Sequence, residues 1–216
     1  MPSAEPADEP QGDAVLPPVW PDGMHPRALG DPNVVIAHFD DAATWHAKLV
    51  AHLLSFAQDP AHGRRYQGAR GIKVDGVHRM PLPELRLVTA RAERLFRQVT
   101  GASRAVVDAA WANIYFRGDY CMPHSHMRST ASIVYCVDPG DDDPDDPLSG
   151  KLFIADPRLD ACCQPVQSYM TSPIVPKMRP GTFVIFPAKV VHAVNPYAGE
   201  RPRITLAWNI GPEAIP

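Results

Sequence analysis

The stretch "MPHSHMRSTASIVYCV", Met122–Val137, sets two histidines one residue apart, directly before a run of residues typical of a β-strand. Side chains at positions i and i+2 of an extended segment point to the same side. His124 and His126 can therefore direct both imidazoles at one point and bind a metal ion there. The alternative is a pair of hydrogen-bonded surface histidines, so a third ligand from elsewhere in the chain is needed to favour the metal.

The strand after the histidines belongs to a series of strands predicted in the second half of the chain. In "AWANIYFRGDY", residues 110–120, the pattern has a period of two, which sets Asn113 and Tyr115 on one face and Ile114 on the other. Further strands are expected at 132–137, 151–155, 182–187 and 203–210. The loop 138–150 carries six aspartates without the ligand spacing of an EF-hand, so we expect a solvated connection.

Two helices are predicted before these strands. The first is capped by Asp40 or Asp41, and the second starts at Pro83 and ends at Gly101. His46 and His52 lie off the apolar stripe of the first helix and are expected to face solvent. That stripe consists of Trp45, Leu49, Leu53 and Phe56.

The order of elements predicts an α+β protein in which helices pack on one sheet of a jelly-roll core. Residues 1–33 are rich in proline, glycine and acidic residues and are predicted to form an N-terminal arm. Residues 34–216 are predicted to form one domain, with helices at about 41–101 and the jelly-roll core at about 105–212.

Composition argues against several kinds of partner. The net charge of −3 gives no reason to expect nucleic acid, and the chain has no apolar run long enough to cross a membrane. The N-terminus lacks the pattern of a signal peptide, and the four cysteines do not form a disulfide framework. We therefore expect a cytoplasmic protein that binds neither nucleic acid nor membrane, and we leave a homodimer open.

A third histidine, and a strand that begins with an arginine, lie near the C-terminal end. His192 follows the predicted strand 182–187, and Arg203 begins the last strand, where it shares a face with Thr205. A face that carries an arginine and a threonine has no reason to be buried unless it binds a charged group. The last strand is therefore predicted to face a ligand.

These motifs together resemble the 2-oxoglutarate- and Fe(II)-dependent oxygenases. The segments "WANIYFRGDYCMPHSH", "GKLFIADPR" and "FPAKVVHAVNPYAGERPRITLAWN" are similar to the bacterial and phage family of 2-oxoglutarate-Fe(II) oxygenases, over about residues 108–210. The resemblance implies a double-stranded β-helix, with Fe(II), 2-oxoglutarate and molecular oxygen as cofactor and cosubstrates. It also implies hydroxylase-type oxidation of an unknown substrate, a small molecule or a peptide, coupled to decarboxylation of 2-oxoglutarate to succinate.

Carried over to this sequence, the resemblance implies a role for each motif residue. His126 stands where the wider superfamily has a carboxylate, so this chain departs from the usual set of two histidines and one carboxylate. Arg203 would hold the distal carboxylate of 2-oxoglutarate, with the Thr205 hydroxyl beside it. Asn113 and Tyr115 would line the cosubstrate pocket. The implied metal ligands are His124, His126 and His192.

Two other classes of protein stay open on the residues alone. One is a cupin-like three-histidine metalloenzyme that does not use 2-oxoglutarate, such as a thiol dioxygenase or a zinc hydrolase. The other is a non-catalytic jelly-roll binding module with structural histidines. Arg203 favours the oxygenase, because a zinc hydrolase has no need of an arginine directed into the same cavity.

Overall fold

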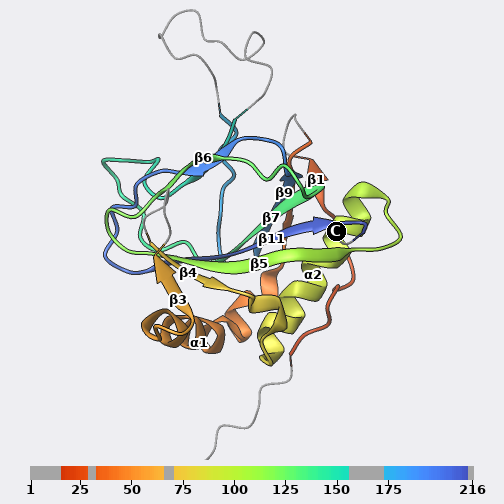
Figure 1. The fold of residues 1–216 in the computed structure, drawn as a ribbon, viewed down its shortest axis with the longest axis horizontal. Coiled ribbons are helices and arrows are strands. Elements are labelled where there is room, and N and C mark those ends of the chain that lie inside the picture. Colours follow the sequence, from red (N-terminus) through yellow and green to blue (C-terminus); the bar gives the residue numbers. More distant parts are fainter. Residues whose placement is uncertain (1–15, 29–32, 66–70, 156–172, 214–216) are drawn as a thin grey trace, which may run out of the picture.

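The computed structural model describes residues 16–28, 33–65, 71–155 and 173–213. Its strands form two sheets that pack against each other, as expected for a double-stranded β-helix (Figure 1). The strands of the larger sheet are antiparallel to their neighbours, in the order β1 (Arg27–Ala28), β2 (Val35–His38), β9 (Thr182–Pro187), β7 (Ala131–Asp138), β11 (Arg203–Gly211), β5 (Val106–Tyr115), β4 (Ile72–Asp75) and β3 (Gly63–Arg65). The smaller sheet has the order β6 (Cys121–His124), β10 (His192–Val194) and β8 (Leu152–Ile154).

The helices cover the face of the larger sheet that points away from β6 (Figure 1). Helices α1 (His46–Gln58) and α2 (Pro83–Thr100) are accompanied by the short 3-10 helices η1 (Asp40–Thr44) and η2 (Val77–Arg79). Residues such as Leu49 and Val88 from the helices form one buried cluster with Leu206 and Trp208 of β11. A second buried cluster, which includes Phe186 and Ile154, joins residues of the two sheets.

The second helix has the bounds that its sequence signals indicate. Pro83 occupies the first turn of α2, where its missing N–H costs nothing. Gly101 caps the helix in the left-handed conformation, with φ of 72°, and its N–H donates to the Arg97 carbonyl. The prediction of this helix is confirmed, because both ends carry residues whose backbone preferences match the required geometry.

The strands after residue 105 are found close to their predicted positions. Strand β9 has its predicted bounds, and β11 is one residue longer at its end. Strands β7 and β8 differ from their predicted bounds by one residue at each end. Strands β1 to β4, β6 and β10 were not predicted. They have only two to four residues each, so they are too short to show a period-two pattern.

His46 is buried, so the prediction that it faces solvent is wrong. Its Nδ1–H donates to the Val137 carbonyl at 3.0 Å, and its Nε2 accepts from the Tyr135 hydroxyl at 2.6 Å. The first turn of α1 lies against β7, so a position beside the apolar stripe is also covered. His52 is half-buried.

The described part of the predicted arm packs against the domain. Leu16 and Trp20 contact the main core, and β1 pairs with β2. Arg91 of α2 is fully buried and donates to the carbonyls of Pro18 and Val19. Its guanidinium also forms a bidentate ion pair with Asp41, at 2.9 and 2.5 Å.

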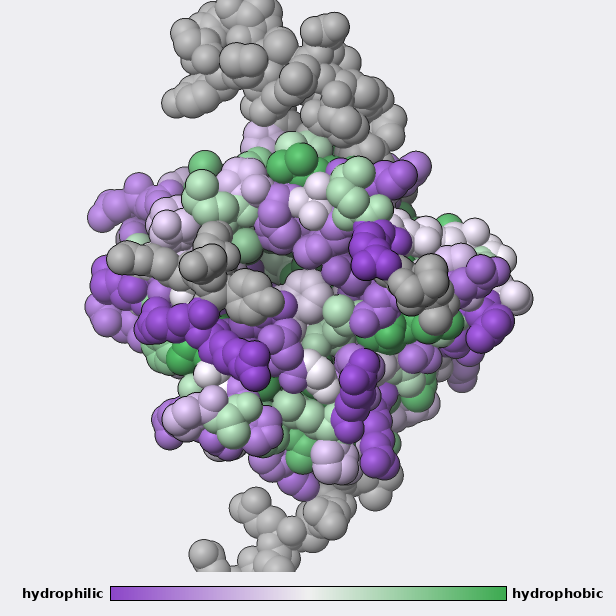
Figure 2. Space-filling model, viewed as in Figure 1, coloured by the Kyte–Doolittle hydropathy of each residue, from purple (hydrophilic) through white to green (hydrophobic). Residues whose placement is uncertain are grey.

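No helix among the described residues is both long and apolar enough to cross a membrane. Figure 2 shows hydrophilic residues spread over the visible face, with apolar residues in smaller groups between them. Asp156 and Arg158 of the quoted "ADPR", as well as Cys162 and Cys163, lie outside the described residues.

We predict that Asp41→Ala lowers the free energy of unfolding by about 3–5 kcal/mol, because it leaves the buried Arg91 guanidinium without its counter-charge. Asp40→Ala is the matched control. Asp40 lies next to Asp41 but is 89% exposed, so its loss should cost about 1 kcal/mol or less. Urea denaturation measures both values, and equal losses in the two variants would contradict a special role for the buried pair.

We predict that His46 makes the protein less stable as the pH falls from 6.5 to about 4. Burial lowers the pKa of His46 from 6.5 to about 4, so in this window the unfolded chain takes up a proton that the folded protein excludes. The free energy of unfolding should therefore fall with decreasing pH, and His46→Gln should reduce this slope by up to about 1.4 kcal/mol per pH unit. Urea titrations at several pH values test this, and identical slopes in both proteins would refute it.

Candidate metal centre

The smaller sheet brings the three predicted metal ligands together. His124 ends β6 and lies directly opposite His192, which begins β10, while His126 follows two residues after β6. Each of the three rings has one nitrogen that could bind a metal, and these three nitrogens all lie within 4.8 Å of one another. The ring centroids of His124 and His192 are 4.3 Å apart, and those of His126 and His192 are 5.2 Å apart. The three side chains can therefore bind one ion.

Backbone carbonyls fix the orientation of two of these rings. His124 Nδ1–H donates to the Met122 carbonyl at 2.8 Å, and His192 Nδ1–H donates to the Val190 carbonyl at 3.0 Å. Each bond selects the tautomer that leaves Nε2 with a lone pair. The backbone N–H of His126 donates to the Ala188 carbonyl at 2.8 Å, which ties the loop after β6 to the end of β9.

The environment keeps two of the imidazoles neutral. Burial lowers the pKa of His192 from 6.5 to about 3, and His124 and His126 add to this effect. Burial lowers the pKa of His126 to about 4, with smaller contributions from His124 and Lys73. A neutral imidazole is the form that binds a metal, so these rings need not lose a proton at neutral pH.

The larger sheet places the predicted cosubstrate residues on one face. Arg203 lies opposite Tyr115, and Thr205 lies opposite Asn113, in the antiparallel pairing of β11 with β5. Residues directly opposite each other project to the same side of a sheet. These four side chains therefore share the face that points away from the helices.

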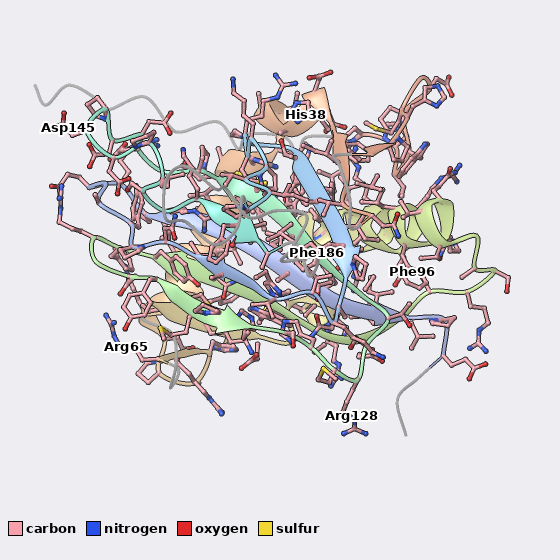
Figure 3. All side chains as sticks on the ribbon, turned by 90° about the horizontal axis from the view of Figure 1, so that it is seen from above. His38, Arg65, Phe96, Arg128, Asp145 and Phe186 are labelled. Atoms are coloured by element: carbon pink, nitrogen blue, oxygen red, sulfur yellow. The ribbon has the colours of Figure 1, made fainter. Side chains whose placement is uncertain are left out.

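Several contacts connect this face to the histidines. The Trp111 ring of β5 lies 5.7 Å from the His126 ring, and Phe186 of β9, labelled in Figure 3, lies 4.8 Å from the His192 ring. The Tyr115 hydroxyl donates to Cys121, whose sulfur is 3.6 Å from His124 Nδ1. The predicted metal ligands and the predicted cosubstrate residues thus border the same space between the two sheets.

Arg203 is a buried cation with an unsatisfied donor. The residue is 4% exposed, and its Nη1 is buried without a hydrogen-bond partner among the described residues. The guanidinium carbon lies 5.7 Å from the centre of the Tyr115 ring. Burial lowers the pKa of Arg203, which means that the protein does not compensate its charge fully. An anionic ligand would supply the missing acceptor.

Some residues beside the site were not among the predicted site residues. Trp111 and Phe186 contact the imidazoles, and the period-two pattern of β5 already sets Trp111 on the same face as Asn113. Lys73 lies over the Trp111 ring at 4.4 Å, but its strand, β4, was not predicted, so no signal indicated its place. Cys121 had a signal, since it is close in sequence to the histidine pair.

The residues present fit the groups that the resemblance implies. Three imidazoles that can present lone pairs suit a divalent transition metal such as Fe(II). The unsatisfied donor of Arg203 suits a carboxylate, which accepts two parallel hydrogen bonds from a guanidinium. The fit rests on the three imidazoles and on the unsatisfied buried N–H of Arg203.

The fold is shared with several solved structures. AviO1 from Streptomyces viridochromogenes Tue57 has a TM-score of 0.60 at 14% identity and covers 84% of this chain and 91% of its own. EctD from S. alaskensis with bound Fe has a TM-score of 0.60 at 14% identity, and the match covers 87% of this chain and 83% of EctD. The viral collagen prolyl hydroxylase from Paramecium Bursaria Chlorella virus-1, in complex with 2OG, has a TM-score of 0.51 at 12% identity. This match covers 81% of this chain and 94% of the hydroxylase.

The sequence comparison agrees with the fold. None of the curated protein sequences matches this chain. The family model described as "Putative 2OG-Fe(II) oxygenase" matches residues 109–209, the segment that contains all three histidines and Arg203. Over residues 109–209 this chain is therefore similar to the family of 2-oxoglutarate- and Fe(II)-dependent oxygenases.

Proposed function

We propose that His124, His126 and His192 hold the Fe(II) and that Arg203 holds 2-oxoglutarate in this protein. The substrate is an organic molecule, small or peptidic, whose oxidation is coupled to decarboxylation of 2-oxoglutarate to succinate. The observation that carries the assignment is the buried, unsatisfied Arg203 guanidinium on the sheet face opposite a cluster of three imidazoles.

The three histidines are assigned to the metal because their geometry is already set for it. The carbonyls of Met122 and Val190 hold His124 and His192 in the tautomer that offers Nε2. His126 takes the position of the usual carboxylate. Bound Fe(II), together with 2-oxoglutarate and O2, would supply the oxidising power for an unactivated C–H bond.

Arg203 is assigned to the distal carboxylate of 2-oxoglutarate. A guanidinium presents two parallel N–H groups, which match the two oxygens of a carboxylate. Thr205 lies two residues further along the same strand face and offers a hydroxyl to the same group. Asn113 and Tyr115, opposite these two residues, would border the bound cosubstrate and restrict its orientation.

We also propose that the protein works in the cytoplasm and binds neither nucleic acid nor membrane. Cys121 and Cys136 are free thiols, which suits a reducing compartment. The net charge of −3 offers no attraction to polyanions.

Loss of any one of the three histidines should abolish tight Fe(II) binding. We expect His124→Ala, His126→Ala and His192→Ala each to weaken Fe(II) binding by more than about 100-fold, since removal of even an outer partner of a metal ligand costs about 10–100-fold. Anaerobic equilibrium dialysis with iron quantification measures this. His62→Ala, on an exposed turn, is the control and should bind normally. Full binding by His126→Ala would remove that residue from the ligand set.

Arg203→Ala should lower the affinity for 2-oxoglutarate by about 10- to 150-fold, because a hydrogen bond to a charged group is worth about 1.5–3 kcal/mol. The measurement is anaerobic titration of the Fe(II)-loaded protein with 2-oxoglutarate, followed by the visible charge-transfer band of the chelate. Arg86→Ala, an exposed position on α2, should leave the titration unchanged.

Oxalate controls for the state of the metal in the Arg203 variant. It chelates metals but has no distal carboxylate, so Arg203→Ala should bind it like the unaltered protein. If iron is bound but no band forms with 2-oxoglutarate in the unaltered protein, the assignment of this cosubstrate is wrong.

A further inference from the structure

The acidic loop, residues 139–150, which connects β7 to β8, is held against the loop before β11 rather than merely solvated. Asp141 accepts from the backbone N–H groups of Glu200 and Arg201, at 2.9 Å each, and from Arg201 Nε at 2.7 Å. These contacts keep the pKa of Asp141 below its usual range. Arg201 also reaches the Asp138 carboxylate at 3.3 Å and donates to the Gly140 carbonyl at 2.8 Å. Asp145, labelled in Figure 3, lies in the outward part of the loop.

A buried tyrosine joins the two loops. Tyr197 is 1% exposed, and its hydroxyl donates to the Arg201 carbonyl at 2.6 Å and accepts from the Asp141 N–H at 2.8 Å. Its backbone N–H donates to the Asp119 carbonyl, and its carbonyl accepts from Gly118. A tyrosine with this many partners is fixed in one orientation, so its ring offers a rigid wall.

The Tyr197 ring lies beside the aliphatic part of the Arg203 side chain. A Cβ atom at Gly150 would stand 3.2 Å from Arg203 Cδ and 2.8 Å from Tyr197 Cδ2, so these two side chains pack closely at this glycine. The Gly150 N–H donates to the Pro196 carbonyl at 3.0 Å, and Ser149 Oγ accepts from the Ala198 N–H at 2.8 Å. Both bonds hold the end of the acidic loop at this place.

These contacts have a consequence for the guanidinium. Within the part of the chain that the structure describes, no hydrogen bond fixes the Nη1 end of the Arg203 guanidinium. An arginine side chain has several rotatable bonds, and packing along its stem is then what limits the directions in which the fork can point. A carboxylate is bound in the bidentate manner only when the fork is correctly directed.

We propose that Tyr197 and Gly150 are positioning residues for Arg203, and that the acidic loop makes the protein selective for a cosubstrate with a distal carboxylate. This inference rests on the proposed role of Arg203. The Asp141–Arg201 contacts hold Tyr197, Tyr197 and Gly150 confine the Arg203 stem, and Arg203 meets the ligand. The loop thus acts on the site without touching the ligand.

Gly150→Ala is the main test, and Gly101→Ala is its matched control. Both glycines have left-handed backbones, with φ of 62° and 72°, so alanine causes similar backbone strain at each. A Cβ at Gly101 meets nothing within 4 Å, whereas one at Gly150 meets both Arg203 and Tyr197. In anaerobic titrations of Fe(II)-loaded protein, Gly150→Ala should bind 2-oxoglutarate about tenfold more weakly, and Gly101→Ala should bind it normally.

Tyr197→Phe is the second variant and keeps the ring while removing both hydroxyl contacts. It should weaken 2-oxoglutarate binding by about fivefold. In the Arg203→Ala background, the same change should have no further effect, because the two residues act as one unit.

Oxalate separates positioning from general damage to the site. Affinity for Fe(II) and for oxalate should be unchanged in Gly150→Ala and Tyr197→Phe, so that only the ratio of 2-oxoglutarate to oxalate affinity falls. Equal losses for both ligands, or unchanged 2-oxoglutarate binding in both variants, would overturn the positioning role while leaving the proposed function intact. Failure of the unaltered protein to bind 2-oxoglutarate would overturn both.

Discussion

The pairing of β11 with β5 on one side and β7 on the other is the constraint on which the rest of the structure depends. All nine residues of β11 are buried, and its two faces serve different purposes. Leu206 and Trp208 pack on the helices, while Arg203 and Thr205 face the smaller sheet. A slip of one residue in this register would exchange the two faces and bury the arginine in the helix interface. The register is therefore a condition for the site as well as for the core.

Charge distinguishes this site from one built with two histidines and one carboxylate. Under the proposed assignment, three neutral imidazoles leave both positive charges of the metal uncompensated, and the buried Arg203 adds another positive charge. Such a site attracts a dianion more strongly than a site with a carboxylate ligand would. The arrangement thus suits a chelator with an acid group at each end.

Much of this architecture could be predicted from the sequence, because it depends on local patterns. Pro83 and Gly101 mark the ends of α2, and alternation in β5 and β11 sets Asn113 and Arg203 on inward faces. What could not be predicted depends on contacts between distant segments. The short strand β4 carries Lys73 to the site. Ile72 and Val74 suit a strand, but a run of four residues is too short to identify one without the edge that β5 offers it. His46 is buried because β7 happens to cover its turn.

The way in which Arg91 holds the N-terminal segment has a consequence for how this protein can vary. Apart from Asp41, the hydrogen-bond acceptors of its guanidinium are the main-chain carbonyls of Pro18 and Val19. Every amino acid has such a carbonyl, so residues 18 and 19 can be substituted in evolution as long as the backbone keeps its conformation. Deletion of the segment, by contrast, would remove two acceptors from a cation that has no access to water. Relatives of this protein should therefore keep the length of this segment more faithfully than its composition.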